Sequence, residues 1–221
     1  MSSRVAFAAA LCVGASLLFA AGPARADEVL DRIVAVVDQT IVTQSEVDLF
    51  ARIRLVRIGK YDDAVHPLTP EARNAAVENL VNQALIYDEA RRLAFQQISE
   101  GEIKRMVGDF RKRFPSALAY EAFLRDNELT LADLQRIFQR MLLCDRFARD
   151  TVGVGVKISD SMIAEFVARY GDQDKLRGRR PEDQKEIARL SLFRQAFDVE
   201  LLRWMQTLRK RSKLRILIVY R

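Results

Sequence analysis

Apolar residues recur at helical spacing along most of this chain. Val77, Leu80, Val81, Ala84 and Leu85 fall at positions i, i+3, i+4, i+7 and i+8, which is the stripe of an amphipathic helix. Similar stripes predict helices that begin after Thr43, Thr69, Ser99, Thr130 and Ser159, a shorter helix over residues 117–125 and a long one over residues 182–211. The pattern therefore predicts a mainly helical protein.

Local signals indicate where two of these helices begin. Thr43 and Glu46 have the S/T-x-x-E spacing of a capping box, and so do Ser99 and Glu102. In this motif the hydroxyl and the carboxylate each accept a bond from a backbone N–H that the helix leaves free. The two helices are therefore predicted to begin directly after Thr43 and directly after Ser99.

Three segments interrupt the helical pattern. Residues 60–68 are mostly polar and are interpreted as a loop, and the glycines of residues 151–157 predict a flexible bend. Residues 172–181 are charged and end in proline, which is typical of a linker. The linker divides the chain between residues 27–171 and residues 182–221.

Short β-branched runs near both ends predict strands. Residues 32–37 and 40–42 flank Asp38 and Gln39, which suit a tight turn, and residues 214–220 form a third run. An isolated hairpin is barely stable, so we expect all three runs to share one sheet. The expected fold class is mainly α, a multi-helix module with a small sheet made by the N-terminal hairpin and the C-terminal strand.

The first 26 residues have the pattern of a cleavable signal peptide. Arg4 supplies the positive charge, residues 5–21 are uncharged and apolar, and Pro23 precedes the small-x-small tripeptide that ends at Ala26. The alternative is an uncleaved anchor, but the run is short and rich in Ala and Gly. We expect cleavage after Ala26, a periplasmic location and no membrane span in the mature chain.

Composition narrows the possible chemistry. The 221 residues carry a formal net charge of +6, which is too mild to indicate nucleic acid. His66 is the only histidine, which excludes three-histidine zinc sites. It lies in a polar run and is interpreted as a solvated residue, whereas Cys144 lies beside an apolar stripe and is interpreted as a buried thiol. We expect no catalytic residues, metal or cofactor.

The middle of the chain is dense in aromatic and methionine side chains. Helices this short are not expected to bury all of them, so part of the set is predicted to line an exposed groove for apolar segments of another chain. The alternative is that the long terminal helix, with Phe193, Phe197 and Trp204, covers them all. The candidate peptide-binding residues are Met106, Phe110, Phe114, Tyr120, Phe123, Phe138 and Met141.

Several segments resemble the SurA-type periplasmic chaperones. Residues 29–50 (VLDRIVAVVDQTIVTQSEVDLF) are similar to the strand, turn and helix that open those proteins, and residues 78–103 (ENLVNQALIYDEARRLAFQQISEGEI) to the next segment. Weaker similarity continues over residues 128–141, 156–166 and 203–220. The resemblance covers most of residues 29–221.

This resemblance implies a function and one departure from the family. SurA-type proteins hold unfolded outer-membrane proteins without ATP, and members carry parvulin-type prolyl-isomerase domains between the N-terminal region and the last helix. Residues 172–181 occupy that position here, and a domain needs on the order of 100 residues. We therefore expect residues 27–171 to be a SurA-like helical domain, completed by residues 182–221, with no isomerase activity.

The expected function is that of a holdase for unfolded outer-membrane or secreted polypeptides, with no nucleic-acid partner. Two alternatives stay open at this point. One is a protein related to peptidyl-prolyl cis-trans isomerases, and the other is a scaffold subunit with one fixed envelope partner.

Overall fold

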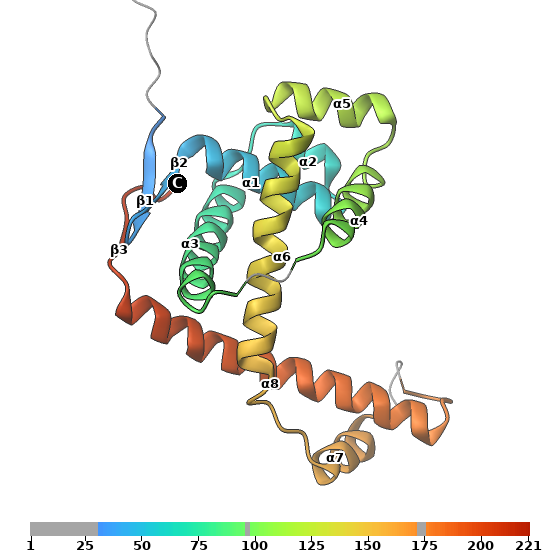
Figure 1. Cartoon of the computed structure of the whole chain (residues 1–221). Helices are drawn as coiled ribbons and strands as arrows, with labels where there is room; N and C mark the ends of the chain where they lie inside the picture. Colours follow the sequence, from blue (N-terminus) through green and yellow to red (C-terminus); the bar gives the residue numbers. More distant parts are fainter. Residues whose placement is uncertain (1–30, 96–97, 172–175) are drawn as a thin grey trace, which may run out of the picture. The chain divides into compact units, whose positions relative to one another are not determined.

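A computed structural model describes residues 31–95, 98–171 and 176–221. The signal peptide expected over residues 1–26 lies outside the described residues, and so do residues 172–175 of the expected linker. Within the described ranges the chain forms eight helices and three strands (Figure 1). In chain order they are β1 (Ile33–Val37), β2 (Thr40–Thr43), α1 (Gln44–Arg57), α2 (Tyr61–Val65), α3 (Pro70–Arg92), α4 (Glu100–Arg111), α5 (Ala117–Asp126), α6 (Leu131–Gly153), α7 (Asp160–Tyr170), α8 (Pro181–Arg211) and β3 (Leu214–Ile216).

The three strands form one antiparallel sheet with the order β2-β1-β3. Val37 is paired with Thr40 on one side and with Leu214 on the other. The predicted fold class is therefore confirmed: a mainly helical chain carries a small sheet built from both of its ends. The C-terminal strand is shorter than predicted, because the residues after Ile216 leave the regular ladder and both Leu217 N and Ile218 N donate to Val34 O, at 2.8 and 3.3 Å.

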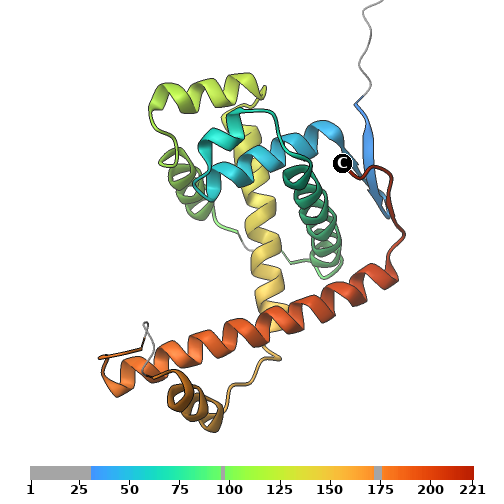
Figure 2. The ribbon, with the colours of Figure 1, turned by 180° about the vertical axis from the view of Figure 1, so that it is seen from behind.

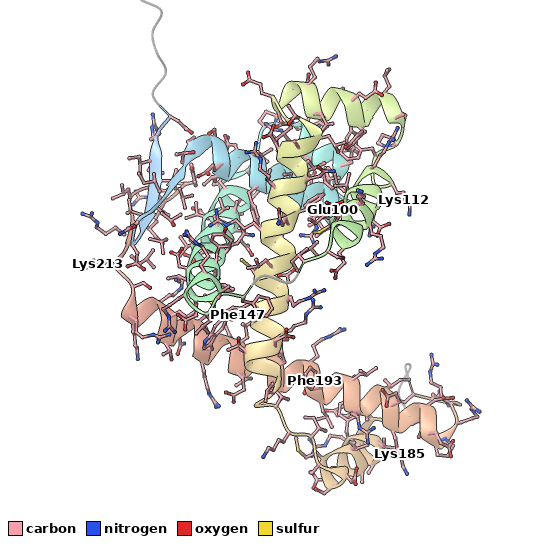
Figure 3. All side chains as sticks on the ribbon, in the orientation of Figure 1. Glu100, Lys112, Phe147, Lys185, Phe193 and Lys213 are labelled. Carbon is pink, nitrogen blue, oxygen red and sulfur yellow. The ribbon has the colours of Figure 1, made fainter. Side chains whose placement is uncertain are left out.

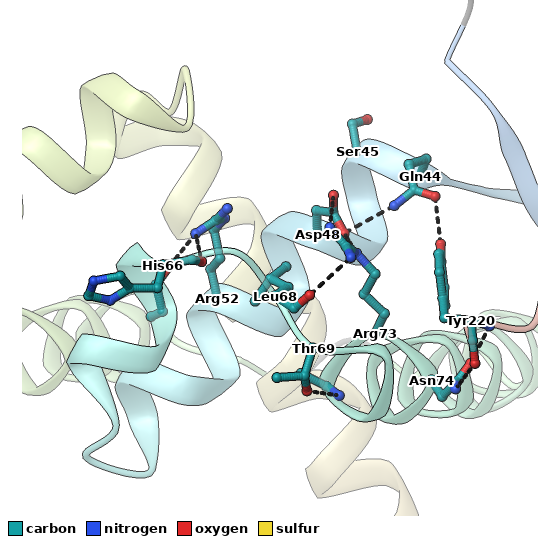
Figure 4. Close-up of polar contacts among 12 residues, drawn as sticks. Gln44, Ser45, Asp48, Arg52, His66, Leu68, Thr69, Arg73, Asn74 and Tyr220 are labelled. Carbon is teal, nitrogen blue, oxygen red and sulfur yellow. Dashed lines mark hydrogen bonds and ion pairs between the residues drawn. The ribbon is translucent and has the colours of Figure 1, made fainter.

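Tyr220 attaches the end of the chain to the helices (Figure 4). Its backbone N–H donates to Asn74 Oδ1 at 3.0 Å, and Asn74 Nδ2 donates back to Tyr220 O at 2.9 Å. The Tyr220 hydroxyl donates to Gln44 Oε1 at 2.7 Å, while the Arg73 guanidinium lies 5.6 Å from the centre of the ring. We call these contacts the Tyr220 latch, which joins the C-terminus to the first turns of α1 and α3.

The helices begin where the capping signals predict. Thr43 and Ser99 both form complete capping boxes, with Glu46 and Glu102 respectively. A third box at Thr130 uses an aspartate at the position where the pattern expects glutamate or glutamine. Each box satisfies backbone donors that a helix start would otherwise leave without partners.

Two predicted irregular segments are partly helical. Residues 61–65 of the predicted loop form the short helix α2, and α6 continues to Gly153, inside the predicted bend. Both predictions were wrong in these places because tertiary packing favours the helix. Ala64 is fully buried on α2, and Val152 is buried near the end of α6.

The core lies where α1, α3 and α6 pack on one another. Phe138 and Leu134 from α6, Ile53 from α1 and Val81 from α3 are all almost completely removed from solvent. The sheet packs on α3, and α4 packs on α6. In both ribbon views the C-terminal end of α6 meets α8, and α7 lies along the N-terminal part of α8 (Figures 1 and 2).

Candidate functional site

The predicted peptide-binding residues are core residues. Six of the seven side chains, all except the half-buried Met106, are buried, so the prediction of an exposed groove was wrong for these six. Four helices meet at these rings in a way that spacing along the chain does not show. The buried six are Phe110, Phe114, Tyr120, Phe123, Phe138 and Met141.

Edge-to-face ring pairs explain this burial. The Phe110 ring centre lies 5.2 Å from that of Phe114 and 5.3 Å from that of Phe138, and Phe114 is 5.3 Å from Phe123. Tyr61 of α2, the segment predicted as a loop, lies 5.4 Å from Phe114. Such pairs stabilise a core beyond the area that they bury. The alternative that α8 covers the aromatic set is also wrong, since α2, α4, α5 and α6 supply these contacts.

Met106 is half-buried and lines a hollow between α4 and α6. The hollow has a volume of about 420 Å³, and Phe110 and Phe138 contribute to its wall. Arg105 and Arg113 line it as well. Met106, Phe110 and Phe138 of the predicted set therefore border this hollow.

Several exposed apolar side chains are on α7 and α8, and others are spread over the rest of the described chain. Leu190 and Phe193 are three residues apart on the long helix, and they are 59% and 39% exposed. Figure 3 labels Phe193 on α8 near the end of α6, and a Cβ on Gly153 would lie 3.7 Å from its ring. We call the following residues the α7–α8 surface: Met162, Leu190, Phe193, Val199 and Leu202.

Sequence reasoning missed this surface for a definable reason. The apolar residues of α8 follow helical spacing over its whole length, and such spacing identifies a face without showing whether anything packs on it. Helices α7 and α8 pack on each other, and a hollow of about 470 Å³ between them is lined by Met162, Phe166 and Leu192. The signal available in the sequence was the presence of apolar residues on more than one side of the helix, such as Val199 and Leu202.

Two adjoining hollows lie among α1, α3, α6 and α8. The first, of about 330 Å³, is mainly apolar and is lined by Leu49, Leu80 and Ile137. The second, of about 440 Å³, includes Met141 and reaches Leu201 and Met205 of α8. Phe50, Ile53 and Gln83 line both. We call the two hollows together the central cleft.

Arg140 lines the first hollow of the central cleft. Its guanidinium lies 4.7 Å from the centre of the Tyr87 ring, a cation–π contact. Its Nε is buried, and among the described residues it has no hydrogen-bond acceptor. A buried donor without an acceptor is costly to a folded protein.

Cys144 lines the second hollow but is not a reactive group. Its thiol is buried and donates to Gln83 O at 3.5 Å. Burial raises the pKa of the Cys144 thiol to about 12, and only the thiolate is a strong nucleophile. The interpretation of Cys144 as a buried thiol is therefore confirmed.

His66 and the acidic side chains are also potential metal ligands. The exposed His66 has Nδ1 2.6 Å from the backbone oxygen of Asp62. In the part of the chain that the structure describes, no three His, Cys, Asp or Glu side chains are grouped so as to hold a metal ion. No helix among those residues is long and apolar enough to cross a membrane.

Neither a protein-family model nor a curated protein matches this chain. The functional argument therefore rests on the residues and surfaces described above.

Proposed function

We propose that this protein is a periplasmic, ATP-independent chaperone that holds unfolded outer-membrane or secreted polypeptides. The signal-peptide pattern of residues 1–26 supports the location. The resemblance of residues 29–221 to the SurA-type chaperones supports the activity. The observation that carries the proposal is the α7–α8 surface, where large apolar side chains remain in contact with water.

Physical chemistry connects that surface to binding. Each apolar group that a client covers contributes about 25 cal/mol per Å² of area removed from water. Leu190 and Phe193 are three residues apart on α8 and so lie on the same side of that helix, and apolar residues exposed side by side are typical of interaction sites. Contacts of this kind do not depend on direction or on a particular sequence, which suits a protein that must accept varied clients and release them.

An aggregation assay tests the proposal. An unfolded outer-membrane protein is diluted from urea into buffer with the purified protein, and light scattering is followed. We expect the wild-type protein to suppress scattering at a near-equimolar ratio. A variant with Leu190→Ser and Phe193→Ser should need several-fold more protein for the same effect.

A matched control shows whether the effect is specific to the α7–α8 surface or follows from the loss of any exposed apolar side chain. Leu118 on α5 is 77% exposed, so Leu118→Ser removes a similar side chain away from the α7–α8 surface and should leave suppression unchanged. Wild-type protein that fails to suppress scattering would refute the holdase function. It would leave a scaffold with one fixed partner as the better explanation.

Isomerase activity is not part of the proposal. Helix α7 ends at Tyr170 and α8 begins at Pro181, so the connection between them is far shorter than the ~100 residues of a typical domain. A proline-containing tetrapeptide should therefore isomerise at its uncatalysed rate, over tens of seconds or longer. Faster exchange in the presence of the protein would contradict this expectation.

A further inference from the structure

The end of the molecule that carries the sheet is basic. Residues 201–221 contain seven Lys and Arg residues and no Asp or Glu. Two of them, Arg209 and Arg211, form ion pairs with carboxylates of α3. Lys213 and Arg215 are exposed, and neither forms an ion pair with another described residue. Positive charge is therefore left at the surface where the chain enters and forms β3.

The acidic residues of the N-terminal hairpin do not neutralise this charge. Asp38, in the turn between β1 and β2, accepts from the backbone N–H of Lys213 at 2.7 Å. Asp31 accepts from Ser45 N at 3.1 Å and from the Ser45 hydroxyl. The sheet and its flanking residues, 31–43 and 213–221, contain four basic and two acidic residues.

One face of the sheet points away from the helices. Helix α3 packs on the sheet, and Val42 of β2 is buried. Its neighbour Ile41 is 52% exposed, because successive side chains of a strand point to opposite faces. Ile41 and Arg215 are both paired with Val36 of the central strand, so they share the outer face. In both ribbon views the sheet lies at the edge of the molecule (Figures 1 and 2).

Large apolar side chains continue beyond β3. Leu217 and Val219 are 57% and 69% exposed, and Figure 3 labels Lys213 at the outer side of the sheet. Cations and exposed apolar side chains thus alternate within a few residues. We call the following residues the sheet patch: Ile41, Lys213, Arg215, Leu217 and Val219.

This combination fits the surface of a membrane with anionic lipids. Lys and Arg side chains are attracted by the negative headgroups, while apolar side chains beside them enter the boundary between headgroups and acyl chains. An acidic protein or a nucleic acid would match the positive charge alone. It would leave Leu217 and Val219 without an apolar environment.

The proposed export of the protein brings the sheet close to such a surface. The expected signal peptide ends at Ala26, seven residues before Ile33 of β1. At no more than about 3.6 Å per residue, seven residues reach about 25 Å at most. While the signal segment is held in the membrane, β1 therefore stays within that distance of it.

We propose that the sheet patch binds the surface of a membrane that contains anionic phospholipids, with Lys213 and Arg215 at the phosphate groups and Leu217 and Val219 in the headgroup region. This goes beyond the holdase function and rests only on the proposed export. Leu190 lies 21 residues before the end of α8, which is about 32 Å of helix. A client on the α7–α8 surface and a membrane at the sheet patch would therefore occupy different ends of α8.

Cosedimentation with vesicles tests the electrostatic part. The exported protein is mixed with vesicles of phosphatidylcholine and phosphatidylglycerol in equal amounts, or of phosphatidylcholine alone. We expect at least tenfold stronger binding to the anionic vesicles, and a steep loss of that binding as salt is added. Equal binding to both vesicles, or binding that salt does not change, would overturn the proposal without any variant.

A pair of charge-reversed variants locates the contact. Lys213→Glu with Arg215→Glu should weaken binding to the anionic vesicles at least tenfold. Lys185→Glu with Arg194→Glu changes the net charge equally on the N-terminal part of α8, where Figure 3 labels Lys185, and should have little effect. Equal losses would show that only net charge matters and would refute the sheet patch.

A fluorescent label tests the apolar part. Cys144 is buried and is the only cysteine among the described residues, so a nitrobenzoxadiazole label reacts selectively with an added surface thiol. On Val219→Cys its fluorescence should rise several-fold with anionic vesicles, and on Leu118→Cys of α5 it should not. An equal rise at both positions, or none at Val219→Cys, would contradict the proposed orientation.

Two further measurements separate this proposal from others. Lys213→Glu with Arg215→Glu should suppress aggregation as the wild-type protein does, so loss of vesicle binding with suppression intact supports two separate sites. Wild-type protein that binds neither vesicle but binds poly-glutamate would overturn the membrane site and assign the patch to an acidic polypeptide. Neither result depends on the outcome of the holdase assay with the wild-type protein.

Discussion

The two ends of helix α8 have similar apolar patterns and opposite surroundings. Leu190 and Leu208 are 18 residues apart, which is five full turns, so they lie on the same face of the helix. Leu208 is 4% exposed, whereas Leu190 is 59% exposed. The residue type and the face are equal, and only the neighbours differ.

Those neighbours come from distant parts of the chain. Near its C-terminal end α8 packs on α3, and Arg209 donates to Glu78 and to Asn82 of that helix. β3 then joins the N-terminal hairpin. The N-terminal part of α8 has mainly α7 beside it. A long helix can thus stabilise the fold at one end and offer a binding surface at the other.

Of the changes considered, removing residues 214–221 should lower the stability of the protein most. The truncation deletes β3 and the Tyr220 latch, which joins α1 and α3 to the chain end. At about 1 kcal/mol for each lost hydrogen bond, we expect the free energy of unfolding to fall by roughly 4 kcal/mol or more. Thermal melting followed by circular dichroism measures this, and an unchanged curve would show that the sheet does not stabilise the helices.

The leucine pair tests the two ends of α8 directly. Leu208→Ala should cost about 2–5 kcal/mol, because it leaves a cavity in the core. Leu190→Ala should change stability by less than about 0.5 kcal/mol, as exposed substitutions generally do. Urea denaturation of both variants gives the two values. Equal losses would mean that Leu190 is covered in solution, for example by a second copy of the chain.

A smaller change weakens the latch alone. Tyr220→Phe removes the hydroxyl that donates to Gln44 Oε1 but keeps the ring beside Arg73. We expect a loss of about 1 kcal/mol, which chemical denaturation resolves. Tyr220 follows the C-terminal end of α8, whereas Leu190 lies in the N-terminal part of that helix. Aggregation suppression by the folded variant should therefore remain at the wild-type level.

The smallest effect concerns pH. The Ser99 backbone N–H, together with Arg146, lowers the pKa of Glu102 from 4.5 to about 2. A carboxyl with a lowered pKa in the folded state stabilises the protein above its unfolded pKa, and this contribution disappears as the pH falls towards the folded pKa. The melting temperature should therefore decline between pH 5 and pH 2.

Glu102→Gln provides the comparison for this decline. The variant lacks the titrating group, so its melting temperature should be slightly lower at pH 7 and fall less steeply with acid. Parallel curves for the two proteins would show that Glu102 does not contribute to acid sensitivity.

Much of the fold could be predicted because its signals are local. The capping boxes at Thr43 and Ser99 act within four residues, and the apolar stripe of α3 repeats within a few turns. The sheet was predictable from a physical requirement, since short β-branched runs at both chain ends need partners. The helix α2 was missed because it depends on tertiary packing, which buries Ala64 and places Tyr61 against Phe114.

The candidate site could not be predicted in the same way. Periodicity correctly marks Phe110 and Phe123 as apolar positions, but the rings of four helices meet there and bury one another. The buried Nε of Arg140 cannot be recognised from the sequence either, because its lack of an acceptor depends on the side chains that surround it.

The sequence by itself determined most of the helices, several of their starts, the sheet and the apolar character of each face. Only the tertiary structure decided which apolar faces are covered. Helix spacing and capping are properties of neighbouring residues, whereas burial depends on which distant segment packs on a face. For this reason the aromatic residues of α4–α6 became core, and Leu190 and Phe193 of α8 stayed at the surface.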